Sequence, residues 1–273
     1  TIRQYWKPFS PEMYRFFAIS TAAVLLFCLF SSVIYLVNDL VDMENDRNHP
    51  TKRFRPLASG ALKRPQAIGA VIVFLIVAVP LAFLIDLRFG LVAIVYLVMM
   101  LLYSFVLKNI VIIDVFTLAS GYVLRVVAGA FAIDVPASAW LYVCTMLLSL
   151  FIGFSKRRHE LVLLEGNATT HRQILKEYNA EVLDEMIAVT TASFVMAYSL
   201  YTFSAPNLPP NHEMMLTIPF ALYIIFRLLY LVHVKHEGGS PEELILRDRP
   251  LFSSIILWAL AVLGIFYVFG RTF

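Results

Sequence analysis

The sequence has little charge and almost no cysteine, and both scarcities limit what it can be. Only 15% of the 273 residues are charged, whereas 60% are hydrophobic and the mean hydropathy is +0.76. Soluble domains carry about 25% charged residues, so the composition excludes a soluble domain and indicates an integral membrane protein. The two cysteines, Cys28 and Cys144, lie in apolar runs. They exclude a disulfide framework and a cysteine metal site, and we interpret them as small buried apolar side chains.

The alternating pattern of β-strands is also missing. A hydrocarbon core of roughly 30 Å takes about 20 apolar residues per helix. Because the backbone must satisfy its own hydrogen bonds in lipid, we expect an all-α polytopic membrane bundle. Eight stretches are long enough, near residues 16–37, 66–86, 89–107, 110–132, 138–155, 183–203, 214–233 and 251–270. The chain starts at Thr1 without a signal-peptide pattern, and we expect a ninth helix to precede it.

Lys and Arg are missing from loops 134–138 and 204–213, whereas most of the 22 Lys and Arg residues lie in loops of the opposite side. The positive-inside rule makes that basic side cytoplasmic. The same loops also carry many carboxylates, which a topology signal does not need. We therefore expect one domain, residues 1–273, with a site capped by cytoplasmic loops. These loops are residues 38–65, 156–182 and 234–250.

Three aspartates follow the first apolar stretch at helical spacing. Asn38, Asp39, Asp42 and Asp46 form the pattern N-D-x-x-D-x-x-x-D. Steps of three and four residues place the carboxylates on one helical face, where they repel one another unless cations lie among them. Mg²⁺ commonly binds a few carboxylates, several waters and substrate phosphates. The pattern predicts a Mg²⁺ site at the three aspartates, with a solvated helix end as the alternative.

Two groups of bases lie near the ends of apolar stretches. The first group is Lys52, Arg53 and Arg55. These side chains suit phosphate oxygens, Arg through its planar fork and Lys as a point charge. The second group contains Lys156, Arg157 and Glu160, and the step of four puts Lys156 and Glu160 on one helical face. A plain positive-inside anchor is the alternative for this second group.

Three further residues are assigned to substrate binding. Tyr103 and Lys108 lie at the end of the third apolar stretch, and Arg125 lies inside the fourth. Because an intramembrane charge is costly, we expect Arg125 to be paired or functional, with snorkelling as the alternative. Arg227, also inside an apolar run, is left unassigned.

The last cytoplasmic loop has the sequence KHEGGSPEELILRDRP. Its glycine pair is typical of a hinge, with Ser240 as N-cap and Pro241 at the first helical position. We expect a short amphipathic helix that ends at Pro250. It would serve either as a lid over the site or as an anchor at the membrane surface.

The aspartate pattern on this scaffold resembles the first aspartate-rich motif of the UbiA superfamily of intramembrane prenyltransferases. The segments NDLVDMENDRNHPTKRFRP, GYVLRVVAGA, FSKRRHEL and PEELILRDRPL, in this order, are similar to its decaprenyl-phosphate phosphoribosyltransferase branch. The resemblance covers essentially the whole chain. Two features depart from the superfamily: eight spans where nine are usual, and Lys156, Arg157 and Glu160 in place of a second aspartate motif. The second departure leaves the number of Mg²⁺ ions open.

The resemblance implies a UbiA-type bundle and a Mg²⁺-dependent glycosyltransferase. Its reaction would transfer 5-phosphoribose from phosphoribosyl pyrophosphate to a polyprenyl (decaprenyl) phosphate and release diphosphate, in arabinogalactan (cell-wall arabinan) precursor synthesis. The implied catalytic residues are Asp39, Asp42, Lys156 and Glu160, and the implied metal ligands are Asp39, Asp42 and Asp46. The implied substrate-binding residues are Asn38, Lys52, Arg53, Arg55, Tyr103, Lys108, Arg125 and Arg157.

Two other functions stay open. A quinone- or haem-type aromatic prenyltransferase would use a polyprenyl diphosphate, but the missing second aspartate motif argues against it. A transporter or lipid flippase would hold its charges near the membrane midplane, whereas here they gather at one face. We expect a multi-pass protein of the plasma (inner) membrane with its site facing the cytoplasm. The expected partners are the lipid bilayer and the two substrates, without nucleic acid and with homo-oligomerisation open.

Overall fold

The computed structural model describes residues 11–48, 52–163, 173–205, 208–209, 211–239 and 241–269. These residues form helices and connecting turns and contain no strand. Within these described ranges, eight helices are long and apolar enough to cross a membrane, which confirms the predicted all-α architecture of a multi-pass membrane protein. The chain divides into two compact units. We call them the N-terminal unit, built on residues 9–137, and the C-terminal unit, built on residues 138–168 and 175–273.

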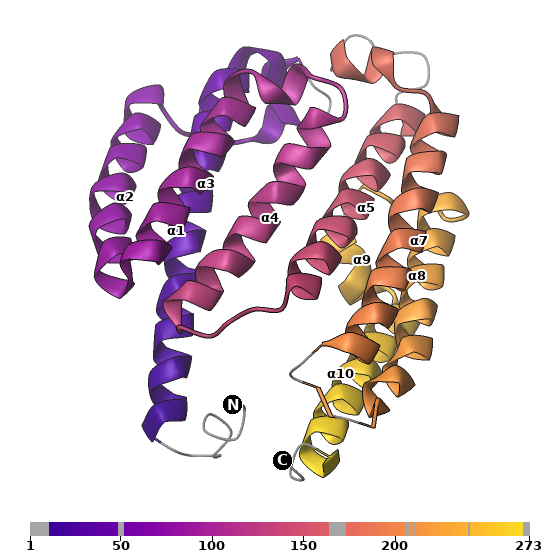
Figure 1. The fold of residues 1–273 in the computed structure, drawn as a ribbon. Coiled ribbons are helices and arrows are strands. Elements are labelled where there is room, and N and C mark those ends of the chain that lie inside the picture. The colour runs from indigo at the N-terminus through magenta and orange to yellow at the C-terminus, as the bar shows by residue number, and fades with distance from the viewer. Residues whose placement is uncertain are drawn as a thin grey trace. The chain divides into compact units, whose positions relative to one another are not determined.

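The N-terminal unit contains four long helices. They are α1 (Pro11–Arg47), α2 (Arg64–Ile85), α3 (Leu87–Phe105) and α4 (Ile113–Ala132). Two short 3-10 turns, η2 (Lys52–Phe54) and η3 (Leu107–Asn109), follow α1 and α3. Helix α1 packs against α2 and α3, and α3 packs against α4, as Figure 1 shows. This arrangement brings the connections after α1 and after α3 to the same end of the unit.

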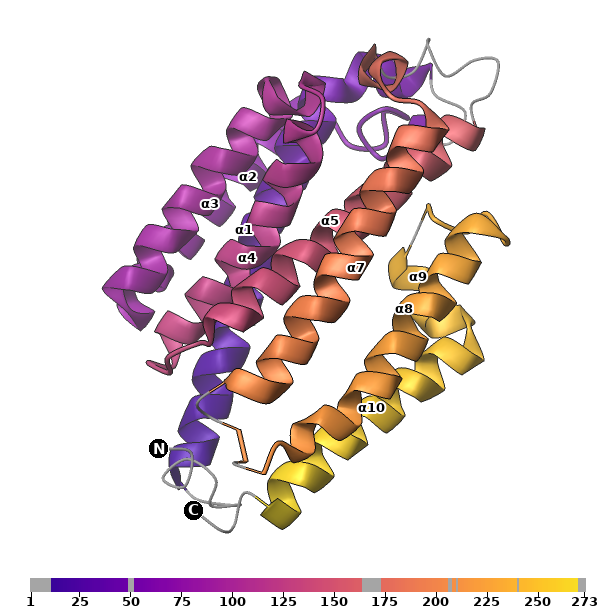
Figure 2. The same cartoon turned by 45° about the vertical axis from the view of Figure 1, so that its right-hand side comes forward.

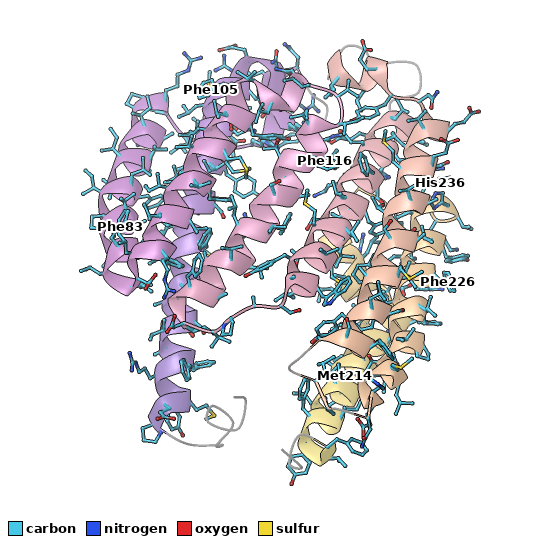
Figure 3. The ribbon with its side chains drawn as sticks, viewed as in Figure 1. Phe83, Phe105, Phe116, Met214, Phe226 and His236 are labelled. Atoms are coloured by element: carbon cyan, nitrogen blue, oxygen red, sulfur yellow. The ribbon has the colours of Figure 1, made fainter. Side chains whose placement is uncertain are left out.

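Aromatic side chains form the core of the N-terminal unit. The Phe27 ring meets the rings of Phe89 and Tyr96 edge to face, at centroid distances of 5.6 and 5.4 Å. Such geometry is the favoured one for aromatic pairs. Helices α2 and α3 approach closely at Gly90, where a Cβ atom would lie 2.5 Å from the ring of Phe83, labelled in Figure 3. Any larger residue at position 90 would therefore require the Phe83 ring to move.

Among the described residues, the C-terminal unit contains five helices. They are α5 (Ala139–Leu163), α7 (Ala180–Ser204), α8 (Ile218–His233), α9 (Pro241–Arg247) and α10 (Arg249–Phe269). The turns η4 (Gln173–Glu177) and η5 (Glu213–Thr217) precede α7 and α8. Helix α5 packs against α7, and α8 lies beside α10, as Figure 2 shows. Tyr198 joins three elements, because its hydroxyl lies 2.6 Å from Thr217 Oγ1 and accepts a bond from Trp258 Nε1 at 2.7 Å.

Two helices in the structure are longer than the sequence predicts. The first apolar stretch continues as helix to Arg47 and the fifth to Leu163, so the three aspartates and the Lys156, Arg157 and Glu160 group lie on helices and not in loops. Because the spacing argument for the aspartates assumes a helix, this extension confirms its premise. Large apolar side chains that stay exposed, such as Phe105 and Phe116 in Figure 3, suit a lipid-facing surface.

Other predicted details need correction. The short helix α9 ends at Arg247 and α10 starts at Arg249, so the predicted end at Pro250 is wrong. Asp248 divides the two helices, because its Oδ1 accepts the Leu251 N–H at 2.8 Å and caps α10. Ser240, the predicted N-cap, lies outside the described residues. Cys28 is exposed and not buried, since it lies on an outer face of α1.

Candidate metal and phosphate site

The end of α1 presents the three predicted aspartates. One guanidinium nitrogen, Arg55 Nη1, donates to Asp39 Oδ1 at 2.8 Å and to Asp46 Oδ2 at 2.9 Å. A single atom reaches both carboxylates because residues seven apart lie two turns apart on the same helical face. The Asp46 side chain is 7% exposed and that of Asp39 is 23% exposed, so the cluster lies at the rim of the unit. The predicted common face of these two aspartates is confirmed.

The segment after α1 holds Arg55 in place. The Arg55 N–H donates to the Lys52 carbonyl at 2.9 Å, and the Ser59 N–H donates to the Arg55 carbonyl at 2.8 Å. Leu57 is buried next to Met43 and Ala67, which fastens the loop onto α1 and α2. Apolar burial of this kind fixes the backbone while the guanidinium stays near solvent. The loop therefore serves to bring one arginine onto the aspartates.

Lys108 brings a second cation to the cluster. Its Nζ donates to Asp42 Oδ1 at 2.5 Å, although the two residues are 66 apart in the sequence. The η3 turn after α3 places Lys108 there, and its side chain is only 14% exposed. Tyr103, one turn earlier on α3, is buried in the core. The structure thus brings Lys108 to the aspartate motif, whereas sequence spacing alone gave it no partner.

The three carboxylates of the cluster share two hydrogen-bonded cations, and Lys52 adds an electrostatic attraction at Asp39. Carboxylate oxygens are ligands that suit Mg²⁺, so the residues present fit the predicted ion. Within the described ranges, however, no three His, Cys, Asp or Glu side chains converge closely enough to hold a metal ion. The aspartate oxygens are turned instead to Arg55 and Lys108. Asp39, Asp42 and Asp46 as metal ligands stay a prediction.

The remaining predicted residues of this segment lie around the cluster. Asn38 is half-buried on α1, immediately before Asp39, and Lys52 is half-buried at the start of η2. The Arg53 side chain is exposed, with its guanidinium carbon 4.8 Å from the centroid of the Phe54 ring. Arg55 is hydrogen-bonded to Asp39 and Asp46, and Lys52 attracts Asp39 electrostatically.

Arg125 has the paired role expected of an intramembrane charge, but its partners are neutral. Its Nη2 donates to Tyr96 OH at 2.8 Å and to Ser31 Oγ at 3.1 Å. Its guanidinium also lies 5.0 Å from the centroid of the Tyr122 ring, a favourable contact for a cation. Ser31 precedes Asp39 by eight residues, about 12 Å along α1. A substrate-binding role for Arg125, at that depth, stays a prediction and would concern the lipid chain.

The second predicted cluster lies on the last turns of α5. Arg157 is almost fully buried, and its Nη1 donates to Glu160 Oε2 at 2.7 Å. The i,i+3 spacing on the helix permits this contact. Lys156 is half-buried on the same turns. These residues belong to the C-terminal unit, and their assigned roles stay predictions.

Sequence reasoning missed a charged network in the C-terminal unit. Arg158 donates from Nε and Nη2 to Asp184, and His233 Nε2 lies 3.1 Å from Asp184 Oδ1. The other ring nitrogen, Nδ1, lies 3.0 Å from the Leu229 carbonyl. The imidazole ring of His233 therefore lies between a carboxylate and a carbonyl, both of which are hydrogen-bond acceptors. Asp184 and His233 are 49 residues apart, and no local pattern connects them.

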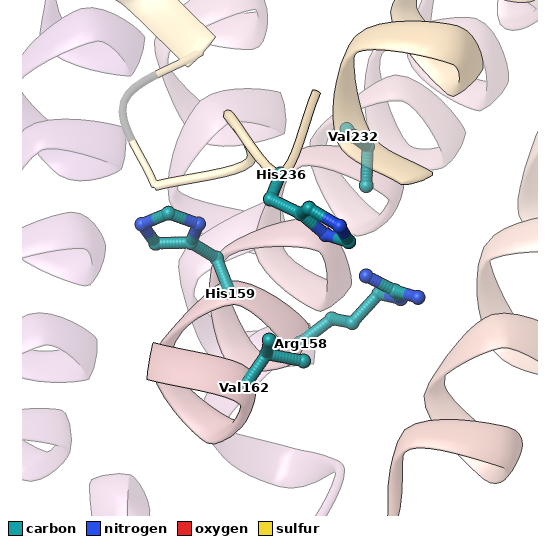
Figure 4. Close-up of a pocket in the computed structure, with 5 residues that line it drawn as sticks. All are labelled: Arg158, His159, Val162, Val232 and His236. Atoms are coloured by element: carbon teal, nitrogen blue, oxygen red, sulfur yellow. The ribbon is translucent and has the colours of Figure 1, made fainter. Parts of the chain in front are cut away.

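A small pocket lies beside this network. Figure 4 shows its lining: Arg158, His159 and Val162 from α5, with Val232 and His236 opposite. The glycine pair of the last loop packs here, since a Cβ atom on Gly239 would lie 2.5 Å from the His159 ring. A larger residue at position 239 would therefore require the His159 ring to move.

Arg227, which the sequence left unassigned, is paired within the same unit. It donates to Asp248 from Nε at 3.0 Å and from Nη2 at 2.7 Å. These hydrogen bonds, with the Leu251 N–H, hold the pKa of Asp248 below its usual value of 3.8. The pair fastens the α9–α10 junction to α8.

Comparison with known proteins decides the family. The chain matches the UbiA prenyltransferase family over residues 7–243. It belongs to this family. A decaprenyl-phosphate phosphoribosyltransferase of Mycobacterium tuberculosis is 34% identical over 249 residues, which cover 91% of this chain and 81% of the relative. The protein of that name from Mycolicibacterium smegmatis is 32% identical over 250 residues, covering 87% and 77% of the two chains.

Solved structures support the same UbiA fold. A UbiA homologue from Archaeoglobus fulgidus bound to GPP and Mg²⁺ has a TM-score of 0.70 and 18% identity, covering 92% of this chain and 88% of that one. A Cd²⁺-bound structure of a UbiA homologue from that organism has a TM-score of 0.65 and 17% identity, covering 92% and 87%. The predicted UbiA-type bundle is thereby confirmed.

Proposed function

We propose that this UbiA-family protein is a glycosyltransferase that moves 5-phosphoribose from phosphoribosyl pyrophosphate to decaprenyl phosphate and releases diphosphate. The observation that carries the proposal is the cluster at the end of α1, where three aspartates contact cations from two other segments. A site with acids for a metal and bases for phosphate suits a diphosphate donor. The names of the M. tuberculosis and M. smegmatis relatives support the acceptor, decaprenyl phosphate, and the transferred phosphoribosyl group.

In the proposed reaction the bond between the anomeric carbon and the diphosphate breaks, and a bond to the lipid phosphate oxygen forms. Mg²⁺ on Asp39, Asp42 and Asp46 would neutralise charge on the leaving diphosphate. Arg55 and Lys108 would bind the same phosphate oxygens. The lipid phosphate is already anionic at neutral pH, so no strong general base is needed. Catalysis would then be mainly positioning and preorganised electrostatics.

The other predicted residues take supporting roles in this proposal. Asn38 would supply a neutral oxygen, and Lys52 with Arg53 would bind outer phosphate oxygens. On α5, Lys156 would bind phosphate while Glu160 binds metal or a ribose hydroxyl, and the almost fully buried Arg157 would orient Glu160 through their ion pair. Tyr103 and Arg125 would line the path of the isoprenoid chain.

We further propose that the enzyme lies in the plasma membrane with its site toward the cytoplasm. The excess of Lys and Arg in alternate loops supports this orientation. A water-soluble donor would then enter from the cytoplasm, while the polyprenyl chain stays in the bilayer. In this proposal the product serves the synthesis of cell-wall arabinan, and the three charged loops cap the site.

The direct test is transfer of radiolabelled phosphoribose from phosphoribosyl pyrophosphate to decaprenyl phosphate by the purified protein, with Mg²⁺ or with chelator. We expect Mg²⁺-dependent label in the organic phase. A folded protein that leaves the label in water but uses a polyprenyl diphosphate and an aromatic acceptor would overturn the proposal in favour of prenyl transfer.

A further inference from the structure

Arg55 and Lys108 occupy positions at the aspartate cluster from which they would repel an incoming metal ion. Arg55 Nη1 bonds to both Asp39 and Asp46, and Lys108 Nζ bonds to Asp42. Each of the three carboxylates therefore has one oxygen engaged by a side-chain cation. A metal ion drawn to the same carboxylates meets charges of its own sign at contact distance. In a partly buried site this repulsion is poorly screened.

A metal ion alone and a metal ion with diphosphate differ in what they offer the displaced side chains. Mg²⁺ alone would push Arg55 and Lys108 off the carboxylates and supply no new anion for them. A diphosphate brings several anionic oxygens, which accept charge-assisted hydrogen bonds from Arg and Lys. Joint binding thus keeps every charge paired, whereas binding of the metal alone does not.

The side chains have the freedom that such an exchange needs. The Arg55 side chain is 37% exposed, although its loop is held by buried Leu57. Its guanidinium can therefore turn from carboxylate to ligand while the backbone stays in place. Lys108 has a flexible four-carbon stem on the separate η3 turn, so it can move independently of Arg55.

We propose that Arg55 and Lys108 are exchangeable counter-ions, which hold the aspartates in the free protein and transfer to the diphosphate when metal and donor bind together. This inference rests on the proposed function, because it takes a diphosphate as the ligand. The exchange makes the metal and the diphosphate bind cooperatively, and the metal binds only weakly in the absence of diphosphate. By linkage, each raises the affinity of the other by the same factor.

The experiment measures metal binding to the purified full chain in lipid nanodiscs, with Mn²⁺ as the spectroscopic probe. Mn²⁺ is titrated alone and with inorganic pyrophosphate. For the parent protein we expect pyrophosphate to tighten Mn²⁺ binding about tenfold or more, a typical coupling between two linked sites. Arg55→Gln should bind Mn²⁺ alone about tenfold more tightly than the parent and lose most of the pyrophosphate effect. Lys108→Gln should change in the same direction, through Asp42.

Two variants serve as controls. Arg64→Gln also removes an arginine paired with an acid of α1, but its partner Glu44 is exposed and lies outside the three-aspartate cluster. It should bind Mn²⁺ as the parent does. Arg55→Lys keeps the positive charge and should keep the weak binding of Mn²⁺ alone, which separates charge from side-chain shape. Thermal unfolding of each variant verifies the fold.

Several outcomes would overturn the exchange. Weaker or unchanged Mn²⁺ binding in both folded Arg55→Gln and folded Lys108→Gln would make these side chains fixed supports of the aspartates. Independent binding of Mn²⁺ and pyrophosphate to the parent protein would also overturn the proposed exchange. If the parent transfers phosphoribose without this coupling, only the exchange fails. If it binds both ligands cooperatively but transfers no phosphoribose, the proposed function fails and the exchange stands.

Discussion

The ion cluster on α1 and the Arg227–Asp248 pair differ in how completely their charges are matched. In the α1 cluster, three aspartates share two hydrogen-bonded cations, Arg55 and Lys108. Arg227 and Asp248 form a one-to-one pair with two parallel hydrogen bonds, and Asp248 also caps α10. An unmatched cluster can attract a further cation, whereas a matched pair cannot. We therefore assign ligand binding to the first and structural support to the second.

The largest effect is expected at the unmatched cluster. Asp39→Asn and Asp42→Asn should each lower phosphoribosyl transfer at least about 100-fold, because a neutral amide cannot hold the metal that balances the leaving diphosphate. The melting temperature of either variant should not fall enough to explain this loss of turnover. The organic-phase label assay at saturating substrates measures turnover. Near-parental turnover in either variant would remove that aspartate from the metal site.

Breaking the matched pair should affect stability and not chemistry. Arg227→Met keeps much of the apolar stem but leaves Asp248 without its cation, so the melting temperature should fall by ~2–4 °C. Turnover per folded molecule should change much less. The double variant Arg227→Met with Asp248→Asn should recover part of the loss, because it leaves no unpaired carboxylate. A loss of turnover without a loss of stability would instead assign Arg227 and Asp248 a role in the reaction.

The pH dependence of stability offers a further test of the structural role of the Arg227–Asp248 pair. Because Arg227 and the Leu251 N–H lower the pKa of folded Asp248, its ionised form stabilises the protein. That contribution is complete above the usual Asp value of 3.8 and is lost as the pH falls through the lower pKa of the folded state. The melting-temperature gap between parent and Asp248→Asn should therefore narrow on acidification below about pH 4. A gap that widens there would contradict this assignment.

The smallest effect is expected at a third, exposed ion group. Glu44 contacts Arg47 and Arg64, and all three side chains are largely open to solvent. Solvent screens such pairs, so Glu44→Gln should change the free energy of unfolding by less than about 1 kcal/mol. Phosphoribosyl transfer should stay at the parental level. Denaturant titration and the label assay, run beside Asp39→Asn, measure both quantities.

Local spacing made part of the site predictable. The common face of Asp39 and Asp46 follows from the helical period, and α1 continues far enough to realise it. Spacing could not choose Arg55 from its neighbours Lys52 and Arg53, because that choice depends on how the loop folds over Met43. Lys108 was predicted to bind substrate, but its bond to Asp42 joins residues 66 apart.

The sequence by itself determined the class of the protein: eight apolar helices, their approximate bounds, and acids and bases at one end of the spans. Composition and periodicity act locally and do not need the rest of the chain. Only the tertiary structure decided which partner each charged side chain meets, as in Arg125 with Ser31 and Arg227 with Asp248. Such contacts depend on how distant helices pack. Packing also sets the low-dielectric surroundings of each charged group, and these decide how strongly the group is held by its partner and whether a ligand can reach it.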